Sequence, residues 1–475
     1  MHGRRRMKTM KAAETARERA HRPSLAAWWR RPARRHNRYR GVRASPIGRI
    51  ANLPSASVDP RYFYDHFVRR RRPCVINEMP VDMAAIMNSL WTSRTARELN
   101  VQVEVRDGPT DAFGKGRHLE TTFGTVLDDQ STNMYLTTQE VPEGQLVAAP
   151  LTAIADTLPI RPELLGKLVP QSINLWLGRS TAPASSGLHH DFHDNLYVLL
   201  RGRKRFRLFS PADAHKMYTH GRLRCVHPNG RINYVSHSKT TADGRELEDL
   251  AAGVMWRAQR VQKRAEARLE RAEVMSQQAV PGAQEAIEDA EERLDIAMDR
   301  LASARAACNK ARRKAAGRRK RISTSTSHSK VMVNSDSSPP ERNAPPPSFS
   351  QIADLTRELE RLRHKGAAES DYPLLAEATM MECELTAGQM LYLPAGWFHE
   401  VSSNGSDAHG SADGSADGGL HCAVNYWYHP PQDSLSGGSF ECPHGHIGQM
   451  FWEREFKREW ARAMHSLPKL SPCHT

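Results

Sequence analysis

The chain has 475 residues, of which 39% are hydrophobic, and a formal net charge of +15. This length allows two or three domains, and the low apolar fraction indicates that part of the chain does not pack into a core. It contains no run of 18 apolar residues, and its N-terminus lacks the apolar segment of a secretory signal. We therefore expect neither a membrane span nor secretion.

Most of the excess charge lies in residues 1–50, which carry 16 Lys or Arg and 2 Glu, a net charge of +14. Such a block favours a disordered tail, with mitochondrial targeting or nucleic-acid binding as alternatives. The seven Cys are scattered and form no C-x-x-C pair. This favours ordinary thiols in a reducing compartment over a zinc site within residues 421–446. We expect an intracellular protein of the nucleus or cytoplasm.

Residues 51–240 are expected to form the first structured part. Residues 58–80 predict a helix and a short strand, and the four Arg at 69–72 are expected to form a solvated helix end. Residues 151–168 predict a helical region that ends before Pro170. Short apolar runs predict strands at 74–76, 101–105, 134–138 and 173–177.

Residues 241–345 are expected to be an insertion. Residues 246–280 and 284–314 predict two helices joined by Pro281-Gly282. An apolar residue recurs every seven positions in the second, with Ala between, which is the spacing of a helical hairpin or coiled coil. We favour a solvated hairpin over a dedicated partner-binding arm.

The end of the insertion is strongly basic, with eight Lys or Arg in residues 310–321, and a Ser/Pro-rich linker follows. The cluster indicates a nuclear-localisation or nucleic-acid-binding patch, or the basic last turns of a helix.

Residues 346–432 are expected to return to β-structure, interrupted by a flexible Gly/Ser/Asp/Ala-rich loop at 402–420. In residues 433–475, large apolar side chains recur at helical spacing from Trp452 to Met464. This predicts an amphipathic helix over residues 446–467, which either packs against the rest of the chain or forms a homodimer.

The most informative motif is His189-x-Asp191, in the segment SGLHHDFHDN. Residues i and i+2 of a strand face the same way, so these two side chains can share a ligand, and His399 of PAGWFHEV can complete the set. Two His and one carboxylate are the ligands of non-haem Fe(II) oxygenases. Spacing alone leaves the pair Asp191 and His193 open, whereas His190 faces away from Asp191. A polar strand end without a ligand is a further alternative.

Residues 186–211 resemble the first half of a JmjC domain, the double-stranded β-helix of the cupin superfamily, and residues 388–401 and 422–431 resemble its second half. The resemblance is greatest to the small protein-hydroxylase branch and covers about residues 50–240 and 346–432. It implies a mainly β fold with helices, a jelly-roll core with an inserted helical hairpin, and disordered basic segments. The loop at 402–420 is longer than the family pattern usually has.

The resemblance also implies which residues bind the metal and the cosubstrate. It assigns Fe(II) to His189, Asp191 and His399, with 2-oxoglutarate and O2 as cosubstrates. Lys204 matches the family lysine that pairs with the far carboxylate of 2-oxoglutarate, a strong charge-assisted contact in a partly dry pocket. The other residues matched to the cosubstrate pocket are Ser186, Tyr135, Asn195 and Asn425.

The activity implied is an Fe(II)- and 2-oxoglutarate-dependent dioxygenase that hydroxylates a protein side chain. The alternatives are an N-methyl-lysine demethylase, a tRNA-base hydroxylase, and a non-catalytic JmjC scaffold that acts through its helical hairpin. All three ligands and Lys204 are present, which argues against the scaffold. The expected partner is a protein substrate, with nucleic acid as a second partner through the basic tail or residues 310–321, and no membrane.

Overall fold

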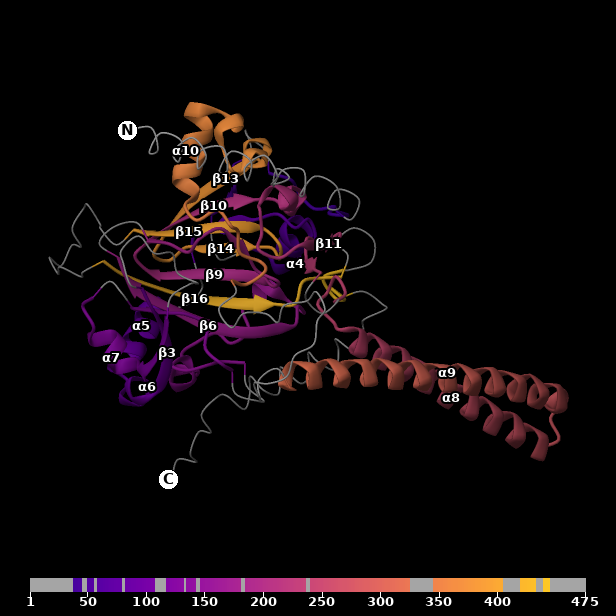
Figure 1. Ribbon diagram of the computed structural model, residues 1–475. Coiled ribbons are helices and arrows are strands. Elements are labelled where there is room, and N and C mark those ends of the chain that lie inside the picture. Colours follow the sequence, from indigo (N-terminus) through magenta and orange to yellow (C-terminus); the bar gives the residue numbers. More distant parts are fainter. Residues whose placement is uncertain are drawn as a thin grey trace, which may run out of the picture.

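The computed structural model describes residues 37–44, 49–54, 58–78, 82–106, 117–131, 134–141, 146–180, 184–235, 240–324, 345–404, 419–432 and 439–444. Two β-sheets form its centre, and a long helical pair extends away from them (Figure 1). The predicted C-terminal helix, most of the basic tail and most of the loop at 402–420 lie outside the described residues. No helix within the described part is long and apolar enough to span a membrane.

The larger sheet has nine strands, in the order β1-β2-β14-β9-β16-β6-β5-β3-β4. Only β1 and β2 are parallel; the other neighbours are antiparallel. The strands are β1 (Ala51–Leu53), β2 (Cys74–Ile76), β3 (Asn100–Val105), β4 (Arg117–Thr122), β5 (Met134–Leu136), β6 (Pro170–Arg179), β9 (Asp194–Arg201), β14 (Met390–Leu393) and β16 (Leu420–Tyr428).

The smaller sheet has the order β13-β10-β15-β7, and β8 also pairs with β15. Its strands are β7 (Ala184–Ser185), β8 (His189–His190), β10 (Arg203–Phe209), β13 (Met380–Thr386) and β15 (Phe398–Asn404); β11 (Leu223–Val226) and β12 (Ile232–Tyr234) form a separate pair. In both sheets, strands from before and after the insertion alternate. This confirms the predicted mainly β, jelly-roll fold.

The burial of β9 explains its continuous apolar sequence, LYVLL. Leu196 and Val198 face one core cluster, which includes side chains of the outer helices. Tyr197 and Leu199 face another, with Phe206 of the opposite sheet. A strand that is buried on both faces carries an apolar run instead of an alternating pattern.

Short helices cover the outside of the larger sheet and the ends of the barrel. They are α4 (Pro60–Phe63), a π-helix (Tyr64–Val68), α5 (Met83–Thr92), α6 (Arg94–Glu98), α7 (Phe123–Asp128), α10 (Leu355–Lys365) and the 3-10 helices Pro211–Lys216, Ala367–Glu369 and Pro373–Glu377. The predicted helical region at 151–168 consists of two 3-10 helices, Leu151–Ile154 and Glu163–Leu165. Prolines at 159 and 162 explain the break, because proline lacks the N–H that a helix interior requires.

The insertion contains α8 (Leu247–Gln277) and α9 (Ala283–Thr324), which pack side by side and project from the barrel (Figure 1). Their contact is lined by small buried residues, including Ala265, Ala272, Ala290 and Ala297. The first helix ends three residues earlier than expected, and the second continues ten residues further, through the basic cluster. Residues 240–245 are not part of the projection, because Asn233 of β12 donates to the Thr240 carbonyl at 2.8 Å.

Candidate metal centre and cosubstrate pocket

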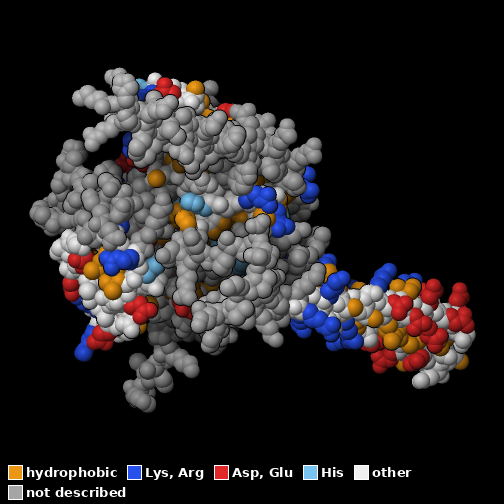
Figure 2. Space-filling model, in the orientation of Figure 1, with side chains coloured by type: hydrophobic (Ala, Val, Ile, Leu, Met, Phe, Trp, Pro, Cys, Tyr) orange, Lys and Arg blue, Asp and Glu red, His pale blue; other side chains and the backbone are white. Residues whose placement is uncertain are grey.

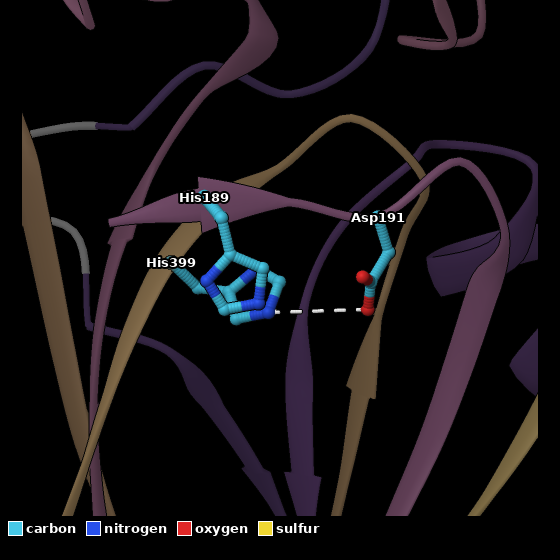
Figure 3. A group of neighbouring side chains, drawn as sticks. All are labelled: His189, Asp191 and His399. Carbon is cyan, nitrogen blue, oxygen red and sulfur yellow. Dashed lines mark ion pairs between the residues drawn. The ribbon is translucent and has the colours of Figure 1, made fainter. Parts of the chain in front are cut away.

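His189, Asp191 and His399 lie together on the inner side of the smaller sheet (Figure 3). β8 pairs with β15 so that His189 is directly opposite His399, and Asp191 follows β8 by one residue. One ligand atom from each of the three residues lies within 4.8 Å of the others. His399 Nε2 is 3.9 Å from Asp191 Oδ2. The i, i+2 geometry and the strand register together produce this convergence.

The hydrogen bonds of the two imidazoles fix which nitrogen is available to a metal. His189 Nδ1 lies 2.9 Å from the Gly187 carbonyl, and His399 Nδ1 lies 3.0 Å from the Trp397 carbonyl. Because a carbonyl oxygen only accepts, each Nδ1 must donate, and each Nε2 then keeps its lone pair. Burial, followed by the neighbouring His189, lowers the pKa of His399 to about 4, so its ring is neutral at physiological pH. Neutral imidazole is the form that binds metal.

The other two His of the motif point elsewhere. His190 Nε2 is 2.6 Å from the Tyr234 hydroxyl, and its ring packs against Phe398. Burial lowers the pKa of His190 to about 3, which keeps it neutral inside the core. His193 stacks on Trp427 at 5.9 Å between ring centroids. Neither belongs to the group formed by His189, Asp191 and His399.

A buried ion pair holds the loop that carries Asp191. Arg71 binds Asp194 through both terminal nitrogens, with 2.7 Å between Nη1 and Oδ2, and both side chains are almost fully buried. Asp194 also accepts from the Tyr392 hydroxyl at 2.8 Å and from the Ala395 amide at 2.9 Å. The expectation of a solvated helix end at residues 69–72 is therefore wrong for Arg71. Arg71 lies in the turn that follows the π-helix, where its φ of 56° redirects the chain.

The three side chains line a cavity of about 340 Å³ between the two sheets. The cavity walls also include Tyr135, Trp176, Ser186, Asn195, Tyr197, Phe206, Val401 and Trp427. A larger hollow of about 690 Å³ beside α10 is lined mainly by charged residues and contains none of the predicted site residues. The candidate metal ligands therefore lie in the smaller, more apolar cavity.

Lys204 is buried beside this cavity, although it lies in the basic sequence RGRKRFR. Its Nζ donates to Ser403 Oγ at 2.5 Å, lies 3.1 Å from His421 Nδ1, and is 5.5 Å from the centre of the Tyr135 ring. Burial lowers the pKa of Lys204 to about 7, since few polar groups replace its water. An anion in the cavity would reverse this effect by supplying the missing negative charge.

Ser186 and Tyr135, both predicted for the cosubstrate pocket, line the cavity in different ways. The Ser186 hydroxyl donates to the Gly187 carbonyl and accepts from the Val401 amide, each at 3.0 Å. The serine in contact with Lys204 is Ser403, which is its directly paired residue on β15. Tyr135 lies near Lys204 through the face of its ring.

Asn195 and Asn425 join the aspartate to the larger sheet. Asn195 Nδ2 donates to Asp191 Oδ2 at 3.4 Å, and Asn425 Nδ2 donates to Asn195 Oδ1 at 3.2 Å. Asn425 Oδ1 accepts from Asn174 Nδ2 at 3.1 Å and from Trp176 Nε1 at 3.0 Å. This chain of hydrogen bonds orients the side chain of Asp191.

The residues that sequence analysis missed are Ser403, His421, Asn174 and Trp176. The signal was the period of two: His421 and Asn425 are four residues apart on β16, and Ser403 is four residues after His399 on β15. Residues i and i+4 of a strand share a face. Burial, reinforced by the nearby Lys204, holds the pKa of His421 well below its usual value, so its Nδ1 accepts from the ammonium.

The segment that returns from the insertion forms one wall of the cavity. Phe349 stacks on His189 with 4.7 Å between ring centroids and an interplanar angle of 11°. Pro346 also lines the cavity, and the Ser350 amide donates to the Leu188 carbonyl at 2.8 Å. The segment that follows the insertion is therefore part of the site, whereas α8 and α9 contribute no residue to the cavity lining.

The donor set fits a resident Fe(II) ion and a dicarboxylate cosubstrate. Two imidazoles present Nε2 and one carboxylate presents an oxygen, which is the facial set of non-haem iron sites. The hydrogen bonds to the Gly187 and Trp397 carbonyls and from Asn195 orient the three groups, as metal ligands require. Lys204 is a buried cation with no acidic partner among the described side chains, which suits a bound anion.

Comparison with known proteins agrees with this geometry. The cupin-like domain family matches residues 60–434. JmjC domain-containing protein 4 of Schizosaccharomyces pombe is 28% identical over 430 residues, which make up 83% of this chain and 86% of the relative.

Two further relatives match shorter stretches. The lysine-specific demethylase JMJ32 of Arabidopsis thaliana is 32% identical over 87 residues, 18% of this chain and 23% of the relative. The human bifunctional peptidase and (3S)-lysyl hydroxylase JMJD7 is 29% identical over 170 residues, 32% of this chain and 52% of the relative. Since the family match spans most of the chain and these relatives are JmjC proteins, the protein belongs to the JmjC-like, cupin-like domain family.

Proposed function

We propose that the protein is an Fe(II)- and 2-oxoglutarate-dependent dioxygenase that hydroxylates a side chain of a protein substrate. The observation that carries this proposal is the convergence of His189, Asp191 and His399 on one cavity, with the buried ammonium of Lys204 beside the same cavity. When bound, iron with 2-oxoglutarate and O2 supplies the oxidising chemistry, and the protein supplies position and water exclusion.

In this proposal, different residues of the cavity bind the metal and the cosubstrate. His189, Asp191 and His399 hold the metal on one side and leave its other positions free for small ligands. Lys204, held by Ser403 and His421, pairs with the far carboxylate of 2-oxoglutarate.

The burial of Lys204 keeps water away from its ammonium, so the contact between ammonium and carboxylate is stronger than it would be in solvent. Phe349, stacked on His189, keeps that ring in place.

A protein side chain is the favoured substrate, because the resemblance of the sequence is to the protein-hydroxylase branch. A human relative is named as a lysyl hydroxylase, which supports the same class. N-Methyl-lysine demethylation is the second candidate, supported by the name of the Arabidopsis relative.

Both reactions begin with oxidation of a C–H bond, so the metal centre alone does not distinguish them. A tRNA-base hydroxylase and a non-catalytic scaffold complete the alternatives.

The metal centre is tested with protein purified without oxygen and loaded with Fe(II). We expect one iron per chain and 2-oxoglutarate turnover, measured as succinate. Asp191→Ala should remove both, because it deletes one of only three ligands. The control is His364→Ala, an exposed His of α10, which should keep both. Full iron binding in Asp191→Ala would contradict the assignment.

The substrate class is tested by adding peptide, methylated histone and tRNA pools to the active protein. Mass spectrometry separates the outcomes: a gain of one oxygen on a peptide supports hydroxylation, and loss of a methyl group supports demethylation. An oxidised tRNA base supports the third candidate. An iron-free protein that leaves every pool unchanged would support the scaffold.

A further inference from the structure

The helical pair α8 and α9 carries an uneven distribution of charge. Figure 2 shows Lys and Arg side chains over the end of the pair nearer the barrel, and Asp and Glu side chains over the far end. The far end includes Glu285, Glu288, Asp289, Glu291 and Glu292 on α9. None of the residues assigned to the metal or the cosubstrate lies on α8 or α9, so the proposed oxidation does not explain this charge pattern.

Five arginines of α8 lie on one side of the helix. Arg257, Arg260, Arg264, Arg268 and Arg271 follow one another at spacings of three or four residues, and all are exposed except Arg257, which is partly exposed. This spacing places successive side chains on the same face. We call these five residues the arginine flank. Their fourteen-residue span corresponds to about 21 Å of helix.

The arginine flank lacks the acidic neighbours that a solvated helix usually provides. None of its five members has an Asp or Glu three or four residues away along α8. The acids of this stretch, Glu266, Glu270 and Glu273, lie on the other side of the helix by the same spacing rule. Each neighbouring Arg pair costs about 0.2–0.5 kcal/mol by repulsion. A helix face that keeps five arginines despite this repulsion is expected to bind an anion from outside the chain.

The second helix leaves most of this flank open. Arg268 forms an ion pair with Asp289 of α9 at 2.9 Å, which fixes the relative position of the two helices. The two helices run in opposite directions from this ion pair. Arg257 lies eleven residues before Arg268, and Arg300 lies eleven residues after Asp289, so the two arginines are at the same height along the pair. Arg300 therefore extends the basic surface. Among the described side chains, no acidic group pairs with Arg257, Arg260 or Arg264.

We infer that the arginine flank binds the phosphate backbone of a double-stranded nucleic acid. A duplex carries about one negative charge per 1.7 Å of its length, so a straight array of about 21 Å meets a dense and regular series of phosphates. Guanidinium groups bind phosphate with two parallel hydrogen bonds, and the flank contains arginine only.

Other occupants fit less well. α8 carries one aromatic side chain, the partly buried Trp256, so it offers no series of rings on which successive bases of a single strand could stack. Membrane-surface helices need a continuous exposed apolar face, whereas the large exposed apolar residues of α8 are three separate valines, Val254, Val261 and Val274. An acidic protein partner seldom offers a straight charge array of this length, and the flank lacks the aromatic anchors common at protein interfaces.

The test compares two full-length triple variants of equal charge. Arg257→Gln/Arg260→Gln/Arg264→Gln removes three members of the flank. The matched control, Lys263→Gln/Arg305→Gln/Arg312→Gln, removes three exposed cations of the same hairpin that lie off the flank. Fluorescence anisotropy measures binding of labelled duplex RNA, duplex DNA, single-stranded RNA, phosphatidylserine vesicles and polyglutamate over a range of salt. Circular dichroism checks that each variant remains helical.

The expected result is duplex binding that the flank variant weakens about tenfold or more and the control weakens about threefold or less. In the flank variant, the slope of log affinity against log salt should fall by about 2.7, at about 0.9 per phosphate contact. Equal losses in both triple variants, or preference for vesicles or polyglutamate over duplexes, would overturn the inference. If the flank variant does not fold, Arg260→Gln alone should lower the slope by about 0.9.

Discussion

Replacing Lys204 with methionine should make the unliganded protein more stable at pH 7 while destroying its proposed cosubstrate site. Lys204 is almost fully buried, and burial lowers its pKa from 10.5 to about 7. Between those two values the unfolded chain binds more protons at this position than the folded chain. Wild-type stability should therefore rise with pH from 7 to 10.5, and methionine, which does not titrate, should lack this rise.

The magnitude follows from the same shift. A difference of 3.5 pKa units corresponds to about 5 kcal/mol of instability at pH 7, at about 1.36 kcal/mol per unit. The substitution also removes the contacts with Ser403 and His421, which contribute about 1 kcal/mol each. A net gain of about 2–3 kcal/mol in the free energy of unfolding is expected at pH 7. The gain should disappear near pH 9 and become a loss of about 2 kcal/mol by pH 10.5, where only the missing contacts count.

Chemical denaturation at pH 7, 8, 9 and 10 measures this difference. The control is Lys167→Met, an exposed lysine whose replacement should change stability by about 0.5 kcal/mol or less at every pH. Adding 2-oxoglutarate to protein already loaded with a redox-inert divalent metal should stabilise the wild type further and leave the stability of metal-loaded Lys204→Met unchanged.

A Lys204→Met protein that is less stable than the wild type at pH 7 would refute this prediction. A difference in free energy of unfolding that stays constant as the pH rises would refute it as well.

Three further results are expected. Asp194→Ala should lower the free energy of unfolding by about 3–5 kcal/mol because it leaves Arg71 buried without its partner, and the double variant with Arg71→Met should recover much of this loss in denaturation experiments. Gly396→Ala should reduce Fe(II) affinity in titrations. Gly396 has a φ of 79°, and a side-chain carbon there would lie 1.9 Å from the Gly230 carbonyl oxygen. The backbone would have to shift, and the Gly396 amide donates to the carbonyl of the ligand Asp191. Replacing residues 247–344 with a flexible linker of about 12 residues should preserve iron binding and succinate formation, whereas a deletion that removes residues 240–245 as well should lose solubility.

The core of the site could be predicted because its signals are local. His189 and Asp191 share a strand face by their spacing, and Lys204 lies fifteen residues after His189, in the second strand after β8. His399 ends an apolar run with turn residues before it, which is visible without knowing its partner strand. The resemblance to JmjC domains then joined these separate signals, and the family match and the β-rich core confirm the fold class.

The remaining parts depend on contacts between distant residues. Ser403 meets Lys204 only because β10 and β15 pair in one register, and a shift of one residue would replace it. Arg71 was expected in solvent because a run of four arginines looks like a helix end, yet its backbone turns it into the core toward Asp194, 123 residues away. The boundary of the insertion was misjudged because residues 240–245 are polar but pack on the barrel.

The alternation of early and late strands has a consequence for the order in which the chain can fold. β9 lies between β14 and β16, and β10 lies between β13 and β15, so neither early strand has its neighbours until the last third of the chain has been synthesised. The helical pair forms from contacts near in sequence and can fold first. Until then, the first half of the barrel exposes apolar strand edges that favour aggregation. Completion of the barrel, rather than formation of the helices, should therefore limit the rate of folding and the yield of soluble protein.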